Sequence, residues 1–96
     1  MDVELSLEPG WIGAFTRQQA QGTHVIPNGV RIVKASAETG VPRGTLGTVL
    51  GSMWFDTARQ TARLDGGDRL LYFVEWDILP RKAVSVHDFR IKRADT

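Results

Sequence analysis

The sequence contains no cysteine and only two histidines, His24 and His87. Without thiols the chain can hold no disulfide, no thiolate zinc site, no iron–sulfur cluster and no cysteine nucleophile. Neither histidine belongs to a His-x-His or His-Glu-x-x-His pattern, so we expect no metal site. His87 stands beside Asp88 and is expected to be a capping or surface residue.

Long hydrophobic runs are absent as well. No window approaches the roughly 18 apolar residues that a membrane-spanning helix needs. The first residues, Met1-Asp2-Val3-Glu4, are acidic where a secretory signal is basic. We therefore expect a cytoplasmic protein that has no membrane partner.

The motifs that carry common catalytic chemistry are missing too. The aspartates lack the alternating spacing of a calcium loop, and no serine lies in a nucleophile-elbow context. Four glycines superficially suggest a phosphate-binding loop, but no Gly-Lys-Ser/Thr follows them: Gly40, Gly44, Gly47 and Gly51. We expect a protein that is not an enzyme and that needs no cofactor.

What is present indicates one small globular domain. The chain has 96 residues, which is enough for a single hydrophobic core. Its 42% hydrophobic and 24% charged residues match the average of globular proteins, which argues against a disordered or coiled-coil chain.

From Gly29 onward, short β-type runs alternate with turn signals, a pattern typical of a small barrel or sandwich. The runs cover residues 30–34, 45–51, 70–76, 83–86 and 89–92. The pair His87-Asp88 between the last two predicts a tight helical turn. For residues 52–69 two interpretations stay open, a short helix capped by Asp56 or a long continuing hairpin.

Four of these segments resemble the SH3-like β-barrels of the KOW type and their relatives, photosystem I reaction-centre subunit IV and the variable chain of ferredoxin–thioredoxin reductase. The matching segments are Gly29–Lys34 (GVRIVK), Gly44–Val49 (GTLGTV), Tyr72–Asp77 (YFVEWD) and Val86–Ile91 (VHDFRI). The resemblance implies a mostly β protein with a small five-stranded SH3-like barrel at residues 29–93, preceded by an N-terminal extension at residues 1–28. It also implies a non-catalytic protein-binding module, an accessory or small subunit of a larger assembly.

Alternation of side chains along strands predicts which residues face the core. Val74 and Trp76 are placed inward together with Leu70 and Tyr72, and Val30, Ile32 and Val49 point the same way. The opposite face then exposes an apolar set that we interpret as a protein-binding surface, with Trp54 as a freer aromatic beside it: Val33, Leu50, Leu71 and Phe73. The competing interpretation is that the strands of so small a barrel coil, so that both faces are partly covered. Trp11, Ile12 and Phe15 of the N-terminal extension are apolar enough to cover that face, within one chain or between two. The oligomeric state stays open.

The aromatic residues allow a second interpretation. Trp54, Tyr72 and Trp76 have the character of a cation-binding cage, with Glu75 or Asp77 supplying negative charge. The competing interpretation is that Tyr72 and Trp76 belong to the core.

The charges suggest an alternative partner. Net charge is only +1, yet residues 81–93 carry five basic residues against Asp88 alone. Such a patch attracts phosphates, so the alternative function is a KOW-like nucleic-acid-binding domain in which Trp54 stacks on bases. The cations assigned to phosphates are Arg43, Arg81, Lys82, Arg90, Lys92 and Arg93.

Overall fold

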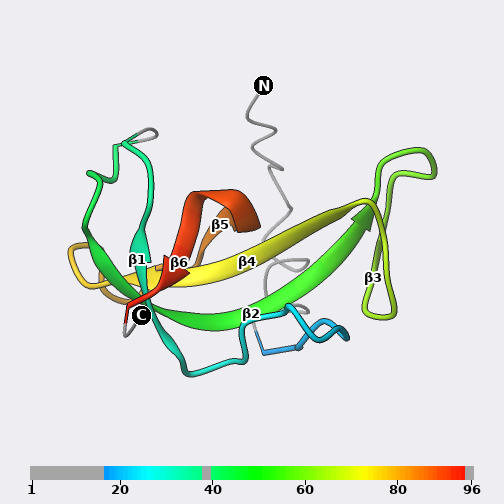
Figure 1. The fold of residues 1–96 in the computed structure, drawn as a ribbon, viewed down its shortest axis with the longest axis horizontal. Coiled ribbons are helices and arrows are strands. Elements are labelled where there is room, and N and C mark those ends of the chain that lie inside the picture. The colour runs from blue at the N-terminus through cyan, green and yellow to red at the C-terminus, as the bar shows by residue number, and fades with distance from the viewer. Residues whose placement is uncertain (1–16, 38–39, 95–96) are drawn as a thin grey trace.

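The computed structural model describes residues 17–37 and 40–94, which form one antiparallel sheet (Figure 1). Its strands are β1 (Arg31–Lys34), β2 (Leu46–Asp56), β3 (Thr61–Arg63), β4 (Arg69–Trp76), β5 (Val84–His87) and β6 (Ile91–Arg93). A single 3-10 turn, η1 (Asp88–Arg90), joins β5 to β6. The mostly β class and the helical turn after His87 are both confirmed.

The strand order is β5-β4-β2-β1-β6, and β3 pairs with the far end of β2. Figure 1 shows β2 and β4 as two long, curved strands with β5, η1 and β6 on the concave side. The sheet has six strands, and it is not closed into a barrel, because β5 and β6 end the path without pairing to each other. The additional strand arises where the sequence left two interpretations open. The hairpin interpretation of residues 52–69 is the correct one, and the helix interpretation is wrong.

A β-bulge at Leu50 divides β2 into two halves with opposite orientation. Val49 lies opposite Val74 of β4, but the next pairing joins Gly51 to Phe73, so Leu50 is an extra residue. One extra residue reverses which side chains face the core from that point onward. Ser52 therefore lies opposite the inward-facing Tyr72, although simple alternation from Val49 would turn Ser52 outward.

The main core lies on the concave side of the sheet. The inward set of β4 is confirmed, since Leu70, Tyr72, Val74 and Trp76 are each at most 4% exposed and belong to one cluster. Ile32 and Val49 belong to it as expected, and Val30 is half-buried. Gly47 is required beneath this cluster, because a Cβ atom there would lie 2.8 Å from the Trp76 ring and 2.9 Å from Val74.

The described part of the N-terminal extension, residues 17–28, contains no helix and packs against the sheet. Ala20 and Val25 are buried in the main core. Backbone hydrogen bonds join Ser52 N–H to the Gln18 carbonyl (2.9 Å) and Gln21 N–H to the Leu64 carbonyl (2.8 Å). The segment therefore occupies the edge of β2 that β1 and β3 leave open. Residues 1–16, which include Trp11, Ile12 and Phe15, lie outside the described residues.

Side chains of the main core fix this segment in place. The Ser52 hydroxyl accepts a hydrogen bond from Ala20 N–H (2.9 Å), and the Tyr72 hydroxyl accepts one from Ile26 N–H (2.9 Å). The indole N–H of Trp54 donates to the Gln21 carbonyl (2.7 Å).

In the part of the chain that the structure describes, no helix has the length and apolarity to cross a membrane.

Replacing Ser52 tests this anchoring. Ser52→Ala leaves the buried Ala20 N–H without its acceptor, which we expect to lower the free energy of unfolding by about 1–3 kcal/mol. Urea denaturation measures the loss, and faster amide hydrogen exchange at Ala20 locates it. Ser85→Ala is the matched control, because the half-buried Ser85 hydroxyl makes no hydrogen bond among the described residues, and its cost should stay within about 0.5 kcal/mol. Equal costs for the two variants would contradict the anchoring role.

The ionisation of Tyr72 gives a pH-dependent test of the burial of its hydroxyl, because Tyr72 is the only tyrosine of the chain. Burial raises the pKa of its phenol, while the hydrogen bond from Ile26 acts in the opposite direction. The pKa of Tyr72 in the folded protein therefore lies above its value in the unfolded chain. The contribution of the neutral phenol to stability is complete below about pH 10 and is lost as the pH rises through the folded pKa. Absorbance at the phenolate band should show ionisation near pH 10 in urea, and at higher pH in the native protein. Native ionisation at the ordinary value would show that the Tyr72 hydroxyl is hydrated.

Candidate functional site

We call the face of the sheet opposite the main core the outer face. The apolar set that the sequence assigns to this face is largely unavailable to a partner. Leu71 and Phe73 do point away from the main core, but they are only 2% and 1% exposed. They pack with Met53 in a second cluster, and Leu50, Phe55 and Ala62 lie against it. The expectation that Leu71 and Phe73 are exposed is therefore wrong, because alternation determines the face of a side chain and not what covers it.

The three aromatic residues considered for a cation cage do not form one. Tyr72 and Trp76 are each 1% exposed and lie in the main core, which confirms the core interpretation. Trp54 is half-buried against the same cluster, and its indole N–H is engaged by the Gln21 carbonyl. It serves to hold the N-terminal segment, which makes it a poor stacking platform for a base.

Two exposed aliphatic side chains lie instead near the start of β2. Leu46, at the start of β2, is 44% exposed, and Ile78, in the turn after β4, is 55% exposed. Val33 of β1 is half-buried and lies directly opposite Leu46. The backbone hydrogen bond from Asp77 N–H to the Leu46 carbonyl (3.0 Å) brings the Ile78 turn beside the start of β2. We call Val33, Leu46 and Ile78 the Leu46 patch.

Sequence reasoning identified Val33 but missed the other two residues of the patch. Leu46 follows from the same alternation that places Gly47 and Val49 inward, so its outward orientation was available from the sequence. Ile78 lies in a turn, where alternation carries no information, and only its apolar character marks it.

Both carboxylates next to the patch are already engaged. Arg31 forms a bidentate ion pair with Asp77, in which its two terminal guanidinium nitrogens lie 2.6 and 2.8 Å from the two carboxylate oxygens. Arg31 also donates a hydrogen bond to the Thr48 hydroxyl (2.9 Å). The hydrogen bond from Arg31 lowers the pKa of Asp77, and the Asp77 carboxylate raises the pKa of Arg31. Glu75 accepts a hydrogen bond from the backbone N–H of Arg81 (2.8 Å).

The basic residues of the C-terminal region do not form a single surface. Lys92 of β6 lies opposite Val33 and so projects on the outer face, whereas Arg93 lies opposite the buried Ile32 and projects on the other. Arg43, Arg81 and Lys82 are exposed in the loops that lead into β2 and away from β4. Arg90 is half-buried in η1. The run of positive charge in the sequence therefore divides between the two faces of the sheet.

An exposed aromatic residue lies beside Arg90. Phe89 is 69% exposed, and the guanidinium carbon of Arg90 lies 5.1 Å from the centre of its ring. The His87 ring stacks on Phe89 at 5.3 Å with an interplanar angle of 12°. His87 occupies the N-cap position of η1, as expected, although its side chain makes no capping hydrogen bond there. The alternative of a surface histidine is wrong, because His87 is only 7% exposed.

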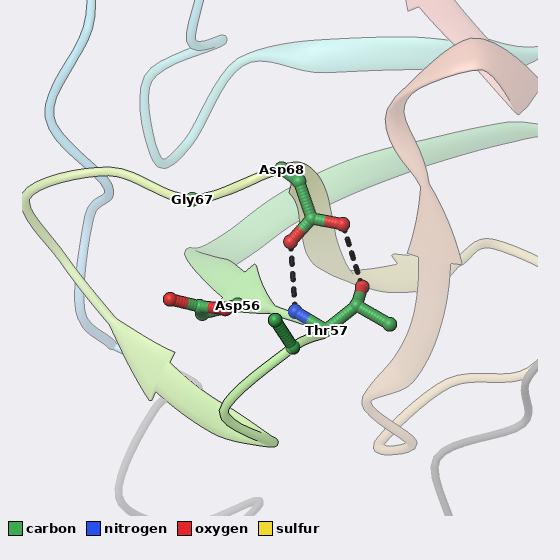
Figure 2. Close-up of a pocket in the computed structure, with 5 residues that line it drawn as sticks. Asp56, Thr57, Gly67 and Asp68 are labelled. Atoms are coloured by element: carbon green, nitrogen blue, oxygen red, sulfur yellow. Dashed lines mark hydrogen bonds between the residues drawn. The ribbon is translucent and has the colours of Figure 1, made fainter.

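A shallow hollow lies where the β2–β3 hairpin meets the loop before β4, and Figure 2 shows its lining. Asp68 accepts hydrogen bonds from the backbone N–H (2.7 Å) and the hydroxyl (2.6 Å) of Thr57, and these bonds lower the pKa of Asp68. The Asp56 carboxylate is directed away from this pair and accepts from Arg59 N–H (3.1 Å). Both carboxylates therefore stabilise the turn.

Neither metal-ligating side chains nor comparisons with known proteins assign a site. Within residues 17–37 and 40–94, no group of three or more histidine, aspartate or glutamate side chains is placed to hold a metal ion. No protein-family model matches the chain, and no curated protein or solved structure matches it. The resemblance to KOW-type barrels stays a prediction from its four sequence segments.

The burial of Phe73 and the exposure of Leu46 predict different losses of stability when each side chain is replaced by alanine. Phe73→Ala should lower the free energy of unfolding by about 3–5 kcal/mol, because it opens a cavity in the second cluster. Leu46→Ala is the matched control on the same face and should cost less than about 1 kcal/mol, since the side chain is already 44% in solvent. Urea denaturation of both variants measures the difference. A near-native stability of Phe73→Ala would contradict the second cluster and return Phe73 to the set of surface residues.

Proposed function

We propose that this chain is a non-catalytic protein-binding module that serves as an accessory or small subunit of a larger assembly. Its fold is proposed to be an open form of the SH3-like barrel of the KOW type, extended by β3. The support is topological: β1, β2, β4 and β5 lie side by side in chain order, and the last strand, β6, returns beside β1 after a 3-10 turn. The proposed domain boundaries are an extension at residues 1–28 and a barrel at residues 29–93.

The single observation that carries this proposal is the exposure of the Leu46 patch. Leu46 and Ile78 leave about half of their surfaces in water, although the same sheet buries Leu71 and Phe73 almost completely. Aliphatic side chains grouped within a polar surface are typical of protein-binding sites, where they supply the apolar centre of the contact. Val33 continues the patch onto β1.

A second candidate function is nucleic-acid binding, and it is favoured by Phe89. An exposed ring with a guanidinium group beside it is the combination on which single-stranded nucleic acids stack. Phe89 would replace Trp54 in this role, with Lys92 of the adjoining β6 available to phosphates.

Photo-crosslinking tests the protein-binding proposal. Benzoylphenylalanine is placed at position 46 or position 78 of the full chain and irradiated in the cells that express it. Both positions should form adducts with the same partner protein, because both belong to one patch. Mass spectrometry identifies the adduct, and the purified partner should bind the unmodified chain while Leu46→Ser weakens that binding at least about five-fold.

Position 61 provides the control, since Thr61 is exposed on β3 and lies outside the patch. The same adduct at positions 46, 61 and 78 would contradict a specific surface. Binding of a single-stranded oligonucleotide that is abolished by Phe89→Ala and weakens steeply with salt, with Leu46→Ser harmless, would favour the second candidate function.

A further inference from the structure

We propose that the Leu46 patch recognises an acidic protein segment whose carboxylates flank apolar side chains. This inference rests on the proposed function, and it adds the chemical class of the partner. Its basis is the charge around the patch, combined with the aliphatic character of the patch itself.

Four basic residues come from segments that adjoin the patch, and we call them its rim. Lys92 lies opposite Val33 across β1 and β6, on the same face as Leu46. Arg81 and Lys82 follow Ile78 in the same exposed turn. Arg43 stands at the tip of the turn that leads into β2, a turn closed by the hydrogen bond from Thr45 N–H to the Pro42 carbonyl (3.2 Å).

Among the described residues, these rim cations have no carboxylate partner. Within the described residues no ion pair involves the side chains of Arg43, Arg81, Lys82 or Lys92. The nearby Asp77 is paired with Arg31, and Glu75 accepts the Arg81 backbone N–H. Positive potential at the rim is therefore available to complement carboxylates of a partner, which favours their encounter and fixes its orientation.

The same charges argue against two other occupants. A second copy of this chain would place one positive rim against another, and like charges across an interface are unfavourable. A nucleic acid would satisfy the rim but not the centre, because Val33, Leu46 and Ile78 offer no aromatic surface for stacking. The exposed aromatic residue, Phe89, lies in η1 outside the patch.

An amide-resolved NMR titration of the full chain tests the inference with four probes. The first is a short peptide in which pairs of glutamates alternate with pairs of leucines, called the Glu–Leu peptide. The second replaces its leucines by serine, the third replaces its glutamates by lysine, and the fourth is a short oligothymidine. The Glu–Leu peptide should bind with a Kd below about 1 mM and shift the amides of Val33, Leu46, Ile78 and Lys92. Raising salt from about 50 to 300 mM should weaken its binding several-fold.

Charge reversal locates the effect. Lys82→Glu and Lys92→Glu should each weaken binding of the Glu–Leu peptide about two- to five-fold, and Leu46→Ser should weaken it at least as much. Arg59→Glu is the matched control, because it makes the same change in net charge on the β2–β3 hairpin, where the Arg59 side chain is 73% exposed. Its affinity should stay within the error of the native protein. An equal loss in Arg59→Glu would overturn a local role for the rim.

The outcomes separate this inference from the proposed function. Equal binding of the Glu–Leu and Lys–Leu peptides at the patch would overturn the acidic partner but leave a protein-binding surface. Failure of every peptide to shift the patch, or shifts caused there by oligothymidine alone, would also overturn the inference. The proposed function itself fails if crosslinking at positions 46 and 78 yields no partner that depends on Leu46, or if position 61 yields the same adduct.

Discussion

The bulge at Leu50 is the constraint on which the rest of the molecule depends. By adding one residue between the Val49 and Gly51 pairings, it turns Ser52 and Trp54 of β2 toward the main core. Their polar atoms then hold Ala20 and Gln21, which close the open edge of β2. Without the extra residue, Ser52 and Trp54 would face outward and the N-terminal segment would lose both anchors.

The same reversal creates the second cluster and so decides where a partner can bind. It brings Met53 onto the outer face beside Leu71 and Phe73, and all three become almost fully buried. Among the described residues of β2, the large apolar side chain that stays exposed is Leu46, which lies before the bulge and pairs with Val33. The exposed aliphatic patch therefore lies at the end of the sheet where loops bearing Arg43 and Lys82 also emerge, and this places apolar and charged groups together.

Much of the fold could be predicted from local sequence, and the candidate site much less. The runs around Ile32, Val49 and Val74 indicated three strands, and the inward set of β4 followed from alternation because β4 has no bulge. Short-range signals also indicated the turn after His87. The site depended on which outward-facing residues are covered by other parts of the chain. In the sequence, Phe73 and Val33 are both outward-facing apolar residues of a strand, so local sequence does not distinguish them. Long-range packing buries the first and leaves the second beside the exposed Leu46.

The sequence by itself determined the β class, the inward face of β4 and the lack of thiol chemistry, since each depends on residue type or on the two-residue period of a strand. Tertiary structure alone decided that β2 contains a bulge and that β3 pairs with its far end. The physical reason is that a strand's neighbours are distant in sequence. Exposure, charge environment and the register across a bulge are properties of those neighbours.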